Sequence, residues 1–203
     1  VTNAPEDAAS VVEQLIAHPA VKRVNFTGST KVGRIIAGTD SKYLKPVLLE
    51  LGGKAPVIVC EDADLDQAVE GVAFGAFFNQ GQICMSTERL IVSDKIADEF
   101  LEKLVAKIKR IKVGSPDLED TTCAYLESVQ SVQRITALID DAVAKGANLP
   151  VPVQTDGALM HPLIVNGITP EMKLYSEESF GPVVTMTTFS SDDEAIRLAN
   201  DTV

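Results

Sequence analysis

The sequence lacks tryptophan and is poor in histidine, cysteine and aromatic side chains. Its 203 residues include two histidines and three cysteines, and aromatic residues make up 5% of the chain. Three is an odd number, and the wide spacing of Cys60, Cys84 and Cys123 forms neither a disulfide framework nor a CxxC metal pair. We therefore expect reduced thiols, a cytosolic setting and no metal site.

Basic residues are also scarce relative to acidic ones. The 18 lysines and arginines stand against 29 aspartates and glutamates, which gives a formal net charge of −11. Nucleic acid and anionic membranes are bound through basic side chains that displace counterions, so this charge excludes both as partners. No apolar run approaches the roughly 20 residues that cross a bilayer, and the N-terminus lacks the basic and apolar regions of a signal peptide. Small ligands and protein partners remain for a soluble chain.

The rest of the chain alternates between apolar stretches of helical and of strand character. The periodicity predicts helices over residues 5–17, 32–37, 62–79, 95–112, 129–145 and 192–199, and strands over 21–26, 46–51, 55–59, 86–93, 163–165 and 183–189. Gly38 and Gly146 are expected to end helices, and 148–157 is expected to be a loop. The alternation predicts an α/β fold, with a largely parallel sheet and flanking helices.

A glycine-bearing turn over residues 26–33 separates a predicted strand from a predicted helix. In such a turn, free N–H groups and the helix dipole favour a phosphate, and Gly28 allows it a close approach. The stretch lacks GxGxxG, and a turn of this composition is more often only a turn. Taken alone, it leaves phosphate binding and a plain turn both open.

Glu50 lies at the end of an apolar predicted strand. A carboxylate there must be paired, protonated or directed at a cavity, and burial would raise its pKa towards the range of a general base. The alternatives are that Glu50 points to solvent or pairs with Lys54.

Cys84 lies in a polar, glycine-bearing connection, whereas Cys60 follows an apolar run and is expected to be structural. Backbone amides beside the Cys84 sulfur could lower its pKa and hold an oxyanion, whereas a lone cysteine in a loop is more often inert. Neither His18 nor His161 has the local context of a base for this thiol, which argues against a cysteine protease. Cys123 has only a packing interpretation.

An acidic pair, Glu177 and Glu178, precedes an aromatic, glycine and proline turn. A carboxylate in this place would accept hydrogen bonds from a ribose, or it would simply be solvated.

Four stretches together carry a resemblance to a known family. In chain order they are Asn25–Thr30, Leu49–Lys54, Gln80–Cys84 and Glu178–Pro182. They resemble the signatures of the NAD(P)-dependent aldehyde dehydrogenases, and the similarity runs through the whole chain. Glu50 and Cys84 are 34 residues apart, as in that family. Four motifs in the family's order are far more specific than any one of them.

The resemblance implies a role for each matching residue. Cys84 would be the nucleophile that forms a thiohemiacetal and then a thioester, with its own N–H donating to the oxyanion, and Glu50 would be the general base that activates the hydrolytic water. Gly28 and Ser29 would meet the phosphates of NAD or NADP, and Glu178 would hold the nicotinamide ribose. The cofactor-binding set would comprise Gly28, Ser29, Gly33, Leu51, Glu178 and Phe180.

Two further stretches, Leu126–Ile135 and Leu174–Phe180, look most like the branch that acts on aromatic aldehydes such as salicylaldehyde, vanillin or benzaldehyde. Met85, beside the nucleophile, is compatible with an apolar substrate. The resemblance also implies a homo-oligomer.

Members of this family are more than twice as long as this chain, which starts at Val1 without a methionine. We therefore expect a piece of a longer protein, with residues 1–51 from the C-terminal part of the NAD(P)-binding domain and 52–203 from a catalytic domain incomplete at its C-terminus. One oxyanion donor and most of the adenosine pocket would lie elsewhere, so the isolated chain should bind cofactor poorly. Two other functions stay open, a cofactor-independent thiol esterase that uses Cys84 and Glu50, and a non-catalytic assembly module built on unpaired strand edges.

Overall fold

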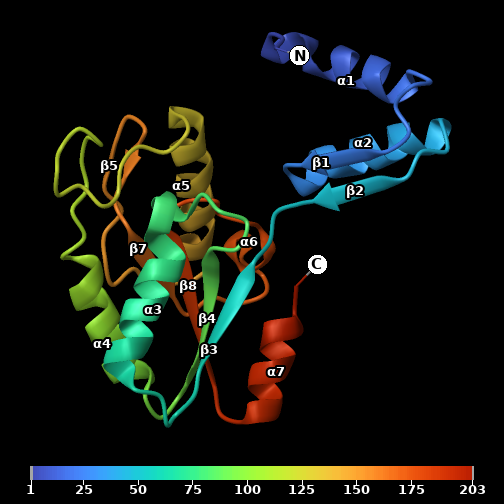
Figure 1. Cartoon of the computed structure of the whole chain (residues 1–203). Coiled ribbons are helices and arrows are strands. Elements are labelled where there is room, and N and C mark those ends of the chain that lie inside the picture. The colour runs from blue at the N-terminus through green and yellow to red at the C-terminus, as the bar shows by residue number, and fades with distance from the viewer. Residues whose placement is uncertain (1, 203) are drawn as a thin grey trace. The chain divides into compact units, whose positions relative to one another are not determined.

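The structure, a computed structural model, describes residues 2–202 and consists of two compact units, Val1–Gly52 and Gly53–Val203 (Figure 1). The division falls one residue after the expected boundary. The assignment of the two units to a cofactor-binding and a catalytic domain stays a prediction. Within residues 2–202, none of the helices has the length and the apolar character needed to cross a membrane.

The first unit contains two parallel strands and three helical segments. Its elements are η1 (Pro5–Asp7), α1 (Ala8–Ala17), β1 (Val24–Thr27), α2 (Thr30–Lys42) and β2 (Val47–Glu50). Strands β1 and β2 pair in parallel, with Val24 opposite Val47 and Thr27 opposite Glu50. The turn between β1 and α2 is therefore next to the end of β2.

Helix α2 extends beyond the predicted range 32–37 at both ends. The Ser29 Oγ accepts a hydrogen bond from the Val32 N–H at 3.3 Å, which is an N-cap contact. The prediction that Gly38 ends the helix is wrong, because a buried stripe that includes Ile36 and Asp40 continues past it. Glycine inside a helix costs about 1 kcal/mol relative to alanine, which does not by itself end the helix.

The second unit is built on a four-stranded parallel sheet. Its elements are β3 (Ala55–Val59), α3 (Leu65–Phe77), η2 (Phe78–Gly81), β4 (Thr87–Ser93), α4 (Ala97–Ile108), α5 (Val129–Ala144), β5 (Thr155–Asp156), β6 (Leu159–Met160), β7 (Leu163–Asn166), α6 (Lys173–Ser176), β8 (Val183–Phe189) and α7 (Asp192–Asn200). The strand order is β3-β4-β8-β7, and all three pairings are parallel. The predicted α/β fold, with a parallel sheet and flanking helices, is confirmed.

Two short features of this unit were not predicted. The expected loop 148–157 contains β5, which pairs with β6 in an antiparallel hairpin, and the four-residue helix α6 precedes β8. Each of these elements is too short to produce the hydrophobic periodicity on which the prediction relies.

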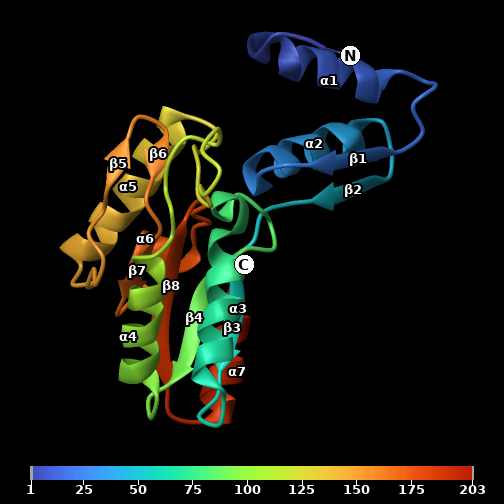
Figure 2. The ribbon, with the colours of Figure 1, turned by 60° about the vertical axis from the view of Figure 1, so that its left-hand side comes forward.

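Strand β4 lies in the middle of the core, and all seven of its residues are buried. Side chains alternate between the two faces of a strand. Leu90 and Val92 join the main cluster with side chains of α3, α4 and α5, whereas Ile91 packs with Phe189 and with Ala195 of α7. Helix α7 therefore covers the face of the sheet opposite to α3 and α4 (Figure 2).

Candidate active site

Three segments of the second unit meet at the amino edge of its sheet. Strands β3, β4 and β8 are adjacent and parallel; Ala55 and Thr87 start β3 and β4 as a pair, and the pairing of β4 with β8 begins at Arg89 and Thr185, the third residue of each strand. The residues just before these strands, 53–54, 84–86 and 178–182, therefore lie near one another. Ligands of open α/β sheets more often bind at the carboxyl edge, so this arrangement could not be assumed from the fold class alone.

Cys84 lies in an exposed turn between η2 and β4. Before it, Asn79, Gln80 and Gly81 have left-handed backbones, with φ values of 49°, 58° and 70°. Such values are uncommon for residues other than glycine, and they persist where the surrounding structure imposes them. At Gly81 a Cβ atom would stand 2.1 Å from the carbonyl oxygen of Gly181, so only glycine allows the two backbones to approach this closely.

The backbone around Cys84 leaves a hydrogen-bond donor available. Its N–H meets no acceptor among residues 2–202, and an N–H in this state could stabilise an oxyanion formed beside the sulfur. A Cβ atom at Gly53 would lie 3.3 Å from the Cys84 carbonyl oxygen, so Gly53 borders the backbone of Cys84.

The three thiols differ in their surroundings. Cys123 is fully buried, and burial raises its pKa to about 11, so it stays protonated at neutral pH. The prediction that Cys60 is structural is wrong, because β3 ends at Val59 and the Cys60 side chain is exposed. Cys60 and Cys84 are therefore both accessible, but only Cys84 lies among the three converging segments.

Glu178 contacts the residue that borders Cys84. Its Oε1 accepts a hydrogen bond from the Gly53 N–H at 3.1 Å. Burial raises the pKa of Glu178, and the bond from Gly53 opposes that shift. The other carboxylate oxygen has no hydrogen-bond donor within the described residues, so it can accept one from a ligand.

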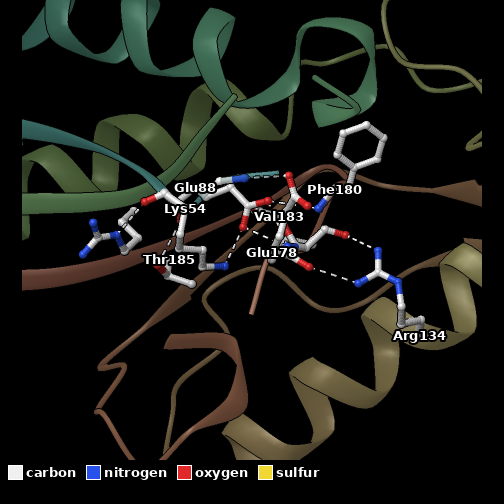
Figure 3. Close-up of polar contacts among 10 residues, drawn as sticks. Lys54, Glu88, Arg134, Glu178, Phe180, Val183 and Thr185 are labelled. Atoms are coloured by element: carbon white, nitrogen blue, oxygen red, sulfur yellow. Dashed lines mark hydrogen bonds and ion pairs between the residues drawn. The ribbon is translucent and has the colours of Figure 1, made fainter. Parts of the chain in front are cut away.

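A buried ion pair joins Lys54, just before β3, to Glu88 of β4 (Figure 3). Lys54 and Glu88 are 5% and 4% exposed, and the Lys54 Nζ lies 2.5 Å from the Glu88 Oε2. Burial lowers the pKa of Lys54, and the Glu88 carboxylate opposes this effect. The alternative that Lys54 pairs with Glu50 is therefore wrong.

Sequence reasoning missed Glu88. The signal that could have found it is the pair Glu88 and Arg89 within a strand that is otherwise largely apolar, since buried charges need partners. Arg89 is a buried charge with such partners, because it donates to the carbonyl oxygens of Lys54, Leu198 and Ala199 at 2.8 Å each.

The first unit brings together its own predicted site residues. The Gly28 N–H donates to the Glu50 carbonyl oxygen at 3.0 Å, so this N–H is already engaged. The N–H groups of Thr30 and Lys31, in the first turn of α2, have no acceptor among residues 2–202. These two groups and the helix dipole give the turn a capacity to bind an anion.

Gly33 and Leu51 contact each other in this unit. A Cβ atom at Gly33 would stand 2.5 Å from the Leu51 Cδ2, so the leucine packs directly on the helix backbone. This contact shows a packing role for both residues, and their predicted contact with a cofactor stays a prediction. The Glu50 side chain is exposed at the end of β2.

The chain is similar to known proteins over its whole length. The model of the Aldehyde dehydrogenase family matches residues 1–203. The chain belongs to this family. It is 55% identical over 201 residues to vanillin dehydrogenase from Pseudomonas sp. (strain HR199 / DSM 7063), and 46% identical over 202 residues to salicylaldehyde dehydrogenase from Pseudomonas putida. In both cases the match covers 99% of this chain and 42% of the relative, so the chain spans about two fifths of their length.

Solved structures of aldehyde dehydrogenases have the same fold. Salicylaldehyde dehydrogenase from Pseudomonas putida G7, complexed with salicylaldehyde, superposes with a TM-score of 0.96 at 44% identity, over 99% of this chain and 42% of the other. Betaine aldehyde dehydrogenase from Staphylococcus aureus, in complex with NAD+, superposes with a TM-score of 0.90 at 33% identity, over 94% of this chain and 39% of the other. These similarities do not favour the thiol esterase or the assembly module.

Proposed function

We propose that this aldehyde dehydrogenase oxidises an aromatic aldehyde to the carboxylic acid, with Cys84 as the nucleophile and NAD or NADP as the hydride acceptor. The observation that carries the proposal is the exposed Cys84 thiol, on a turn packed against the segment of Glu178, in a chain with 55% and 46% identity to dehydrogenases of aromatic aldehydes.

Cys84 would begin the reaction as a thiolate. Its sulfur attacks the carbonyl carbon of the aldehyde, a C–S bond forms, and the carbonyl electron pair moves to the oxygen. The Cys84 N–H, which has no acceptor among residues 2–202, would donate to that oxyanion. Loss of the hydride from the carbon then leaves a thioester on Cys84.

Glu50 would act in the second half of the reaction. As general base it takes a proton from water, the water oxygen attacks the thioester, and the C–S bond breaks to release the acid and the Cys84 thiolate. This role comes from the family resemblance and from the exposed position of Glu50 at the end of β2.

The residues present fit a nicotinamide dinucleotide. The α2 N-terminus, with Ser29 as its cap and two N–H groups without an acceptor among residues 2–202, suits a phosphate. The carboxylate of Glu178 has an oxygen without a donor within the described residues and suits a ribose hydroxyl, and the Phe180 side chain, 39% exposed, can lie against a ring. Bound NAD or NADP would supply the acceptor for the hydride.

An aromatic substrate is proposed because the vanillin and salicylaldehyde dehydrogenases share 46–55% identity with the chain. Met85, next to the nucleophile and 80% exposed, offers an apolar and adaptable surface. A homo-oligomer, also implied by the resemblance, can be checked by light scattering of the purified protein.

The experiment replaces the corresponding segment of the Pseudomonas vanillin dehydrogenase with these 203 residues and measures NADH formation from vanillin. The unchanged chimera is expected to be active, and Cys84→Ala is expected to lower kcat at least about a thousandfold. Cys60→Ala is the matched control, since Cys60 is the other exposed thiol, and its activity should equal that of the unchanged chimera. Activity that survives Cys84→Ala, or no activity with any aromatic aldehyde, would refute the proposal.

A further inference from the structure

Charged side chains hold the backbone of residues 178–180 from two sides (Figure 3). Glu88 accepts the Ser179 N–H with both carboxylate oxygens at 2.9 Å, and it accepts the Phe180 N–H at 2.9 Å. Arg134 donates to the carbonyl oxygen of Glu178 at 3.0 Å and to that of Ser179 at 2.5 Å. Two consecutive N–H groups and two consecutive carbonyl groups are thus bound by ionised partners, whose hydrogen bonds are the stronger kind.

The backbone that these contacts hold is strained. Phe180 has a φ of 46°, a left-handed value that is uncommon for an aromatic residue. At the next residue, Gly181, a Cβ atom would come within 2.3 Å of the Ile135 Cδ1, so the Gly181 backbone packs tightly against α5. A conformation of this kind persists only where its neighbours impose it, and Glu88 and Arg134 are the charged groups that do so.

Stability alone does not account for Glu88. It is buried with Lys54 as its ion-pair partner, and the replacement of a buried ion pair by apolar residues is often neutral or even stabilising. What an apolar pair could not supply is an acceptor for the N–H groups of Ser179 and Phe180. The function of the pair is therefore to be sought in the segment that Glu88 binds.

We propose that Glu88 and Arg134 are positioning residues, which hold residues 178–180 so that the Glu178 carboxylate and the Phe180 ring are presented to the nicotinamide end of the cofactor. The part that names the cofactor rests on the proposed function. The positioning of the segment concerns the described residues alone, so the two parts can be tested separately.

The test compares two double variants that differ only at residue 88. Glu88→Leu alone would leave Lys54 buried and unpaired, which is strongly destabilising, so both variants also carry Lys54→Met. In Lys54→Met/Glu88→Gln the side-chain carbonyl can still accept the N–H groups of Ser179 and Phe180. In Lys54→Met/Glu88→Leu no acceptor remains. Both variants are neutral at positions 54 and 88, so the charges near Glu178 are the same in the two.

The first readout is made by NMR on the 203-residue chain. In the leucine variant the amide protons of Ser179 and Phe180 are expected to exchange at least about tenfold faster than in the glutamine variant. The pKa of Glu178 is raised by burial in the unchanged chain. It should stay raised in the glutamine variant and fall in the leucine variant, as the segment moves towards solvent. Equal exchange rates and equal pKa values in the two variants would overturn the proposal.

Arg134→Lys is a second variant that should leave the chain folded, because Arg134 is exposed. Lysine keeps the charge but cannot bind two carbonyl groups in a fixed fork. Faster amide exchange at Ser179 and Phe180 is expected, and an unchanged rate would contradict the role of Arg134 even if the leucine variant fails to fold.

The second readout uses the vanillin dehydrogenase chimera. The leucine variant is expected to raise KM for NAD about tenfold relative to the glutamine variant, with kcat and the rate of Cys84 alkylation by iodoacetamide little changed. An unchanged KM would overturn the link to the cofactor. If no chimera is active, the proposed function fails, while the NMR comparison still decides whether the segment is positioned by Glu88 and Arg134.

Discussion

The contact between Gly81 and Gly181 predicts a large difference between two alanine substitutions. Gly81→Ala places a methyl group 2.1 Å from the Gly181 carbonyl oxygen, in a residue whose φ is 70°. Gly71→Ala is the matched control, since Gly71 lies inside α3 and a Cβ atom there meets nothing within 4 Å. The two variants have the same chemical change and opposite expected effects on the free energy of unfolding.

The magnitude follows from three contributions. A left-handed backbone costs an alanine about 1–2 kcal/mol, and an overpacked contact costs about 1–3 kcal/mol. The Gly181 carbonyl oxygen cannot move away freely, because it accepts the Val183 N–H at 2.7 Å. The lower entropy of the unfolded chain offsets about 0.4–1 kcal/mol, so Gly81→Ala should destabilise the second unit by about 1–5 kcal/mol. Gly71→Ala should stabilise it by about 0.5–1 kcal/mol.

The assay is urea-induced unfolding, followed through the amide signals of β4, which belong to the core of the second unit. Iodoacetamide alkylation of Cys84, with Cys60 as the internal reference, should show in parallel that the turn has changed shape in Gly81→Ala and not in Gly71→Ala. If the free energy of unfolding of Gly81→Ala differs by less than about 1 kcal/mol from that of the unchanged chain, the close approach of the two backbones does not constrain residue 81.

Two further substitutions test buried charges. Arg89→Met removes hydrogen bonds to the carbonyl oxygens of Leu198 and Ala199, at 2.8 Å each. Since a hydrogen bond from a charged group contributes about 1.5–3 kcal/mol, the free energy of unfolding of the second unit should fall by at least about 3 kcal/mol. Amide exchange in α7 should become faster, and unchanged exchange there would contradict the contact. Asp40 is buried without a hydrogen-bond partner for its carboxylate among residues 2–202, and burial raises its pKa against the opposing charge of Lys45. A raised pKa stabilises the fold in acid, and that stability is lost as the pH rises through the folded-state value. Asp40→Asn should therefore be more stable than the unchanged chain at neutral pH and lose the advantage at acidic pH, and urea titrations with the same pH dependence for both would refute this.

Local patterns in the sequence predicted most of the elements. The predicted strands 55–59 and 183–189 coincide with β3 and β8, because both are short and rich in β-branched residues, which favour extended backbone. The start of α2 two residues before the predicted range is explained by Ser29, whose hydroxyl accepts the Val32 N–H as an N-cap. Gly38 misled the prediction, because a glycine inside a helix costs only about 1 kcal/mol and does not by itself end the helix.

For the candidate site, sequence motifs singled out Cys84, Glu50 and Glu178, and the structure adds their surroundings. The position of Cys84 in an exposed turn agrees with the polar composition around it. The exposure of Cys60 was missed, because an apolar run before a cysteine does not reveal that the strand ends one residue earlier.

By itself, then, the sequence determined the alternation of helices and strands, the family and the identity of the candidate nucleophile, because these depend on neighbouring residues and on motifs. Only the tertiary structure decided which charges lie together. The partners of Glu88 are 34 and 91 residues away along the chain, at Lys54 and Ser179. They meet because β3, β4 and β8 are parallel neighbours whose starts share one edge, and this pairing of distant strands is not encoded in any local pattern.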